Sequence, residues 1–135
     1  MRTQKAGCIV INLDNKKVAL VSRKGQNSFP KGHKEENETI IECALRETKE
    51  ETNHDVELLS DKELIKIEYE TLLGEEVETY FYIAKDLGET KDVIDEAERE
   101  VTIWVPFDAV EKSLSYNNLK EMWNEIKYEV KKFFK

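Results

Sequence analysis

Three glutamates are crowded into the stretch ALRETKEETN, which covers residues 44–53. The stretch is predicted to end a helix, so that Glu47, Glu50 and Glu51 lie in its last two turns. Carboxylates are unfavourable there, because the C-terminal end of a helix carries partial negative charge. On a helix with about 100° per residue, the three side chains fall within an arc of about 100° beside the apolar face. Such a cluster suits Mg²⁺, with Mn²⁺ as an alternative, although the spacing alone fits a solvated acidic face equally well.

The helix that holds these glutamates has recognisable start and stop signals. Thr39 followed by Glu42 is a capping-box pattern and predicts the N-terminus. Asn53, which tolerates left-handed backbone, predicts the C-terminus. Arg46 lies one turn before Glu50 and is placed to pair with it. One face of the helix is predicted to be buried, and its residues recur every three or four positions: Ile41, Ala44, Leu45 and Thr48.

The rest of the chain is predicted to be mostly β-strand. Apolar alternation predicts strands over 6–13, 17–23, 55–72, 75–87 and 101–105. Loops are predicted over 24–37 and 88–100, a short helix over 106–114, and an amphipathic helix from Ser115 onward. These elements predict an α/β fold in a single domain, residues 1–135, with one sheet between a central and a terminal helix.

Charge and composition narrow the classes of function. The formal net charge of −8 argues against a general surface for nucleic acid or anionic membrane. Neither a membrane-spanning apolar run nor a signal-peptide pattern is present in the sequence, so we expect a cytoplasmic protein. We expect it to be either a monomer or a homodimer. Cys8 and Cys43 fit no metal-ligand spacing and are expected to be reduced thiols.

The run GHKEENETIIECALRETKEETNHDV resembles the Nudix box. That family pattern is Gly, five residues, Glu, seven residues, and then Arg-Glu-U-x-Glu-Glu-x-Gly-U, where U is usually aliphatic. The fixed positions that match are Gly32, Glu38, Arg46, Glu47, Glu50 and Glu51. Asn53 replaces the last Gly and His54 the last aliphatic residue, and neither position is a ligand in the family. The resemblance implies an α/β/α sandwich with a mixed sheet, the box helix on one side and the C-terminal helix on the other.

The resemblance also implies a chemistry, the hydrolysis of a phosphoanhydride in a nucleoside diphosphate-linked substrate with a divalent metal ion. The implied metal ligands are the Gly32 carbonyl and the side chains of Glu47, Glu50 and Glu51. Glu38 is the implied supporting carboxylate, and Arg46 the residue that orients Glu50. The general base varies within the family, with Glu47 and Glu50 as candidates here. A further acid often comes from the loop before the last strand, where the candidates are Glu96, Glu98 and Glu100, and we favour the last two.

The segment SFPKGHKEENE resembles the FPKGH…GE segment of the diadenosine tetraphosphate hydrolases within the family. By that resemblance Lys31 and His33 bind polyphosphate, with Arg23 nearby on the incoming strand. Tyr80 and Tyr82 share one face of a strand and are candidates for stacking on a nucleobase. Several positions depart from that subgroup, namely Asn27 and Ser28 near its usual Trp, Asn37 for Gly, and Glu75, Glu76 and Glu78 near its usual Lys.

Three alternatives stay open at this stage. Another Nudix pyrophosphatase, acting on a nucleoside triphosphate, ADP-ribose or a nucleotide sugar, would use the same glutamates. A non-catalytic nucleotide-sensing domain commonly loses box glutamates, whereas this chain keeps them. If the glutamates are merely solvated, no metal ion binds at all.

Overall fold

One mixed sheet organises the computed structural model, which describes residues 2–95 and 100–134. Its central strands are β1 (Thr3–Asn12) and β7 (Glu76–Glu89), which run parallel to each other. The other edge of β1 pairs antiparallel with β2 (Lys17–Arg23) and with the short β4 (Lys31–His33). β2 also pairs antiparallel with β3 (Gln26–Ser28) and, along its other edge, with β8 (Val101–Pro106).

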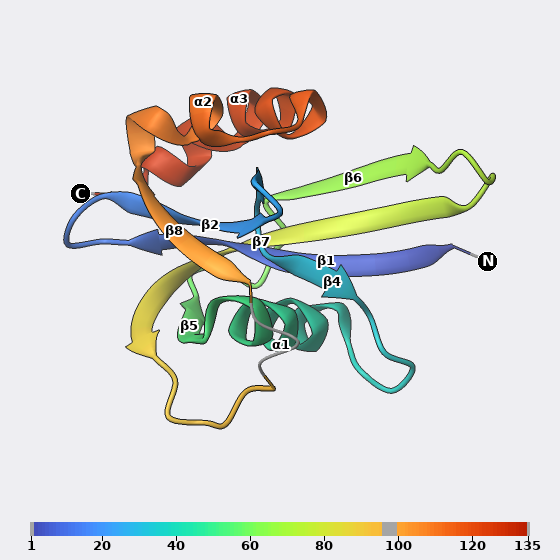
Figure 1. The fold of residues 1–135 in the computed structure, drawn as a ribbon, viewed down its shortest axis with the longest axis horizontal. Coiled ribbons are helices and arrows are strands. Elements are labelled where there is room, and N and C mark those ends of the chain that lie inside the picture. Colours follow the sequence, from blue (N-terminus) through green and yellow to red (C-terminus); the bar gives the residue numbers. More distant parts are fainter. Residues whose placement is uncertain (1, 96–99, 135) are drawn as a thin grey trace.

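Helices cover both faces of this sheet (Figure 1). Helix α1 (Ile40–Thr52) lies on one face, and α2 (Val110–Ser113) and α3 (Asn117–Lys131) lie on the other. A 3₁₀ turn at Phe107–Ala109 leads from β8 into α2. The predicted α/β/α sandwich, with the glutamate-bearing helix and the C-terminal helix on opposite sides, is therefore confirmed. In the described residues no helix combines the length and the apolar character that crossing a membrane requires.

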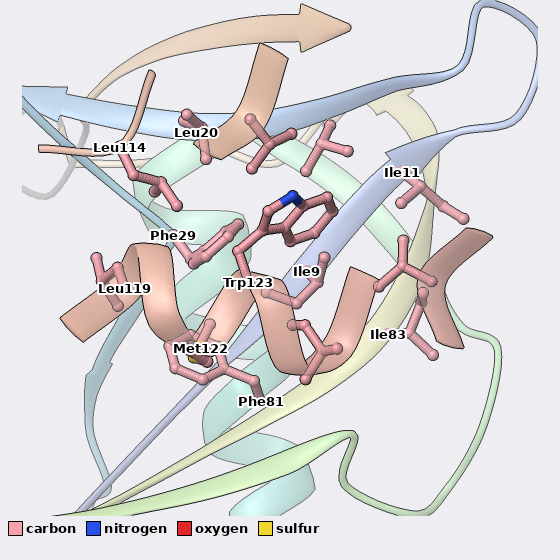
Figure 2. Packing of buried hydrophobic residues seen from close by; sticks show 14 residues of the cluster. Ile9, Ile11, Leu20, Phe29, Phe81, Ile83, Leu114, Leu119, Met122 and Trp123 are labelled. Atoms are coloured by element: carbon pink, nitrogen blue, oxygen red, sulfur yellow. The ribbon is translucent and has the colours of Figure 1, made fainter. Parts of the chain in front are cut away.

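The alternation of β1 supplies both faces of the core, because successive side chains of a strand point to opposite sides. Ala6, Cys8 and Val10 pack in the cluster beneath α1. Ile9 and Ile11 belong to the larger cluster under α3. Figure 2 shows that larger cluster around the buried indole of α3, where the labelled residues are Ile9, Ile11, Leu20, Phe29, Phe81, Ile83, Leu114, Leu119, Met122 and Trp123. Each helix is thus fixed by its own apolar layer on the sheet.

Three predicted elements differ from the structure. The predicted strand over 55–72 is two strands, β5 (His54–Leu58) and β6 (Ile65–Glu70), which pair with different parts of the same edge of β7. The predicted loop over 24–37 contains β3 and β4, which are only three residues long and too short to show alternation. The short helix is divided into a 3₁₀ turn and α2, and Pro106 is the last residue of β8 rather than the first of that helix.

Candidate active site

The local sequence of α1 fixes where its glutamates point. Thr39 Oγ1 accepts a hydrogen bond from the Glu42 amide at 3.0 Å, and the Glu42 carboxylate accepts one from the Thr39 amide at 2.8 Å. Asn53 ends the helix in the left-handed region, with φ 60°, and its amide donates to Lys49 O. Both predicted caps are confirmed, and Asn53 serves where the family pattern has glycine. The buried face differs slightly, since it consists of Cys43, Ala44, Thr48 and Thr52 while Ile41 and Leu45 are half-buried.

Arg46 is the centre of the carboxylate cluster. Its Nη1 donates to Glu47 Oε2 and to Glu50 Oε1, both at 2.9 Å. Its Nε and Nη2 donate to the two oxygens of Glu38 at 2.9 and 2.7 Å, and Nη2 also reaches the His33 carbonyl. These hydrogen bonds hold the pKa of Glu38 down at about 2 and raise the pKa of Arg46. One guanidinium therefore joins the loop, β4 and the helix.

Gly32 lies directly against this cluster. A Cβ built on Gly32 would meet the Glu47 carboxylate at 2.1 Å, so only glycine leaves room for that carboxylate. The thiol of Cys43 donates to the Gly32 carbonyl, with 3.5 Å between the two atoms. The amide of Lys31 donates to Glu51 Oε1 at 3.1 Å. Strand β4 thus brings a backbone carbonyl beside two of the acids on α1.

Burial and neighbouring acids make Glu51 unusual among the carboxylates of the site. Its pKa is raised to about 7, first by burial and then by the charges of Glu47 and Glu100, while the Lys31 amide and ammonium act in the opposite direction. A carboxylate in such surroundings gains more from a bound cation than a solvated one does. The burial of Glu51 and its raised pKa argue against a merely solvated acidic face.

The oxygen-rich donor set, three glutamates of α1 and a backbone carbonyl, is the kind that Mg²⁺ and Mn²⁺ prefer. No three carboxylate, imidazole or thiol groups of the described residues gather closely enough to hold a metal ion as they stand. The contacts explain this spacing, because Arg46 holds Glu47 and Glu50 while Glu51 faces Lys31. The residues fit a divalent cation in kind, and their side chains must turn to bind one.

The loop before β8 adds a fourth acid. The Glu100 amide donates to the carbonyl of Glu51 at 3.1 Å, which places Glu100 beside the end of α1. Its carboxylate forms an ion pair with Arg23, so two residues predicted for different roles contact each other. Glu96 and Glu98 lie outside the described residues.

A cleft of about 760 Å³ lies beside the acids described above. Its acidic lining consists of Glu47, Glu51 and Glu100. Its basic lining consists of Lys5, Arg23, Lys24, Lys31 and His33. Its aromatic lining consists of Phe29, Tyr69, Phe81 and Tyr116. One cavity therefore contains acidic side chains that suit a metal ion, basic side chains and apolar surface. This combination is typical of a small-molecule site.

Tyr80 and Tyr82 do not line this cleft, so the prediction that they stack on a nucleobase there is wrong. Thr79 and Phe81 of the same strand occupy the cleft face, and alternation turns the two tyrosines to the α1 side. Tyr82 is 5% exposed within the core, and the Tyr80 hydroxyl donates to Glu78.

Lys5 is a cation of the cleft that the sequence pattern does not reveal. It precedes the apolar run over 6–13 that predicts the first strand, and it reaches the cleft only through the pairing of β1 with β4 and β7. Burial, followed by the charge of Lys5, lowers the pKa of both Lys31 and His33. Lys5 therefore stands close enough to both residues to affect their charge.

Comparison with known families decides the class of this site. The family model of the NUDIX domain matches residues 1–131. The chain belongs to the NUDIX family. It is accordingly a Nudix-type pyrophosphohydrolase, and hydrolases of this family generally use divalent metal ions. Comparison with curated protein sequences gives no match.

Solved structures of Nudix enzymes share the fold over nearly the whole chain. A NUDIX hydrolase from Nitrosomonas europaea has a TM-score of 0.73 at 17% identity, over 98% of this chain and 91% of its own. The Ap4A hydrolase of C. elegans has a TM-score of 0.71 at 23% identity, over 96% and 98%. A NUDIX-family hydrolase from Clostridium perfringens has a TM-score of 0.73 at 18% identity, over 96% and 99%. At these identities the likeness establishes the Nudix fold.

Proposed function

We propose that this Nudix enzyme hydrolyses a phosphoanhydride bond of a dinucleoside polyphosphate with Mg²⁺. The observation that supports this most strongly is the cleft that brings Glu47 and Glu51 of α1 together with several cations and with aromatic surface. A polyphosphate with a nucleoside at each end needs that combination, because it carries many negative charges between apolar bases. The resemblance of residues 28–38 to diadenosine tetraphosphate hydrolases, and the fold shared with the C. elegans Ap4A hydrolase, support the same substrate class.

The carbonyl of Gly32 and the carboxylates of Glu47, Glu50 and Glu51 would hold the metal ion. A bound Mg²⁺ ion neutralises phosphate charge and lowers the pKa of coordinated water. Arg46 positions Glu47 and Glu50 through one nitrogen, which keeps their carboxylates side by side on the helix. This arrangement supports a positioning role for Arg46.

Cleavage requires a proton acceptor for the attacking water. The water oxygen bonds to phosphorus, the bond from that phosphorus to the bridging oxygen breaks, and the leaving nucleotide takes the bridging oxygen as a terminal phosphate oxygen. Glu47, Glu50 and Glu100 are the described carboxylates that we propose for accepting the proton, and Glu98 is the further candidate from the sequence. Lys31 and Arg23 would neutralise the phosphates on either side of the broken bond, and His33 would donate a hydrogen bond to them.

Substitution of the metal-binding acids tests this function. Glu50→Gln and Glu51→Gln should each lower kcat at least about 100-fold, as expected for losing a metal ligand or base. Both variants should keep the melting temperature of the parent protein within a few degrees. Glu121→Gln, an exposed position on α3 outside the cleft, is the matched control and should retain full activity. Near-parental rates for both Glu50→Gln and Glu51→Gln would contradict the assignment of α1 as the metal site.

The substrate is tested separately from the acids. A panel with Mg²⁺ would contain diadenosine tetraphosphate, nucleoside triphosphates, ADP-ribose and nucleotide sugars. Preferred hydrolysis of another member would retain the glutamate site and overturn the dinucleotide proposal. Binding without any hydrolysis would instead favour a nucleotide-sensing domain.

A further inference from the structure

A row of side chains crosses four strands on the cleft face of the sheet. Lys5 pairs with His33 across the antiparallel β1–β4 contact and with Thr79 across the parallel β1–β7 contact. Thr79 in turn pairs with Ile67 of β6. All four side chains line the cleft. Since directly paired residues share a face of the sheet, the row runs from β4 through β1 and β7 to β6.

The order of the strands determines how far Lys5 lies from the glutamates. Gly32 and Lys31 of β4 contact the carboxylates of Glu47 and Glu51. Strand β1 comes next, one interstrand spacing of about 4.8 Å further from the acids. An extended ligand held at the glutamates would therefore pass Lys31 and His33 before it reaches Lys5.

Close packing of the backbone keeps β4 at this distance. A Cβ on Gly7 would meet the Pro30 carbonyl oxygen at 1.8 Å, so glycine at this position lets the segment before β4 lie directly on β1. Gly7 also pairs with Lys31 in the ladder. The spacing between Lys5 and the two bases of β4 is therefore built into the backbone.

The charge of Lys5 is not neutralised by any acid of the described residues, in which no Asp or Glu forms an ion pair with it. The opposite face of the same strands differs. There Arg2 and Lys66 both pair with Glu78, at 2.8 and 3.2 Å. Although the chain has 29 acidic residues, Lys5 lies beside Lys31 and His33 on the cleft face of the sheet. On the opposite face, by contrast, Arg2 and Lys66 are paired with an acid.

We propose that Lys5 binds the third phosphate of an extended polyphosphate, counted from the glutamates, and so selects such chains over diphosphates. The inference rests on the proposed function, because it takes the reacting anhydride to lie at Glu47 and Glu51. Lys31 and His33 contact the first two phosphates, and the ammonium of Lys5 neutralises the next. A substrate with only two phosphates ends before it reaches Lys5.

Binding of inorganic chains tests Lys5 without any need for catalysis. Isothermal titration calorimetry with Mg²⁺ present would compare tripolyphosphate with pyrophosphate on the full chain. Lys5→Met should weaken tripolyphosphate binding about tenfold, as expected for losing one charge-assisted contact, and change pyrophosphate binding less than about twofold. Lys5→Arg should retain most of the affinity. Lys62→Met removes the same charge at an exposed position outside the cleft and should leave both affinities unchanged.

Kinetics on the same variants separates this inference from the proposed function. If the parent protein cleaves diadenosine tetraphosphate, Lys5→Met should raise KM for it about tenfold while KM for ADP-ribose stays within about twofold. A parent protein that cleaves no polyphosphate but shows Lys5-dependent tripolyphosphate binding would refute the proposed substrate and keep the inference. Equal losses for both inorganic chains, no loss for either, or a parent protein that binds no tripolyphosphate would each overturn the inference.

Discussion

Removal of Arg46 is the perturbation whose consequence follows most directly from the contacts. Its side chain is 26% exposed, and its guanidinium donates to the carboxylates of Glu38, Glu47 and Glu50 and to one carbonyl. Arg46→Met keeps much of the side-chain length but leaves three partly buried carboxylates without their common cation. Breaking a buried ion pair costs about 3–5 kcal/mol, and partial exposure reduces this to about 2–3 kcal/mol.

The expected shift in melting temperature follows from the size of the protein. An unfolding entropy of about 2.1 cal/mol/K per residue gives about 280 cal/mol/K for 135 residues. A loss of about 2–3 kcal/mol therefore lowers the Tm by about 7–11 °C. Thermal unfolding followed by circular dichroism in a chelating buffer measures this shift. Mg²⁺ should then raise the Tm of Arg46→Met more than that of the parent, because it supplies the positive charge that the variant lacks.

Lys132 provides the control for Arg46. Its side chain is 68% exposed and pairs with Glu129, which is 60% exposed, so Lys132→Met should lose about 1 kcal/mol or less. An Arg46→Met variant that melts within about 2 °C of the parent protein would contradict this prediction. Equal stabilisation of the variant and the parent by Mg²⁺ would also contradict it, since the carboxylates would then not share one cation site.

Two further predictions concern the shape of the site and the acid stability of the fold. Gly32→Ala should lower kcat at least about tenfold, because its Cβ would displace the Glu47 carboxylate; steady-state kinetics with an unchanged kcat would refute the close contact. Hydrogen bonds from Gln4 and then Arg2 hold the pKa of Glu78 at about 2, below its ordinary value of 4.5. Its stabilising effect is present above pH 4.5 and lost as the pH falls toward 2, so Glu78→Gln should weaken the pH dependence of urea unfolding in that window. An identical pH dependence in parent and variant would contradict this.

Local signals explain why α1 and its caps could be predicted from the sequence. The capping box at Thr39, the left-handed cap at Asn53 and the spacing of the glutamates all lie within about four turns of one helix. Each depends on residues a few positions apart, so tertiary structure has little influence on them.

Non-local pairing explains what the sequence could not predict. Strand β4 has three residues and exists because Gly7 lets it lie on β1. Lys5 reaches the cleft through the same pairing, from a position that alternation alone assigns only to one face or the other. The error over Tyr80 and Tyr82 has this origin, since both faces of β7 are buried and its residue types do not reveal which face α1 covers.

Product analysis with Mg²⁺ on diadenosine tetraphosphate tests the central claim most directly. We expect the parent protein to release ATP and AMP in equal amounts, and Glu51→Gln to release both at least about 100-fold more slowly. Hydrolysis in H₂¹⁸O should place one ¹⁸O on a single product, as attack of water on one phosphorus requires. An intact dinucleotide after prolonged incubation, or equal rates for the parent and Glu51→Gln, would contradict the account.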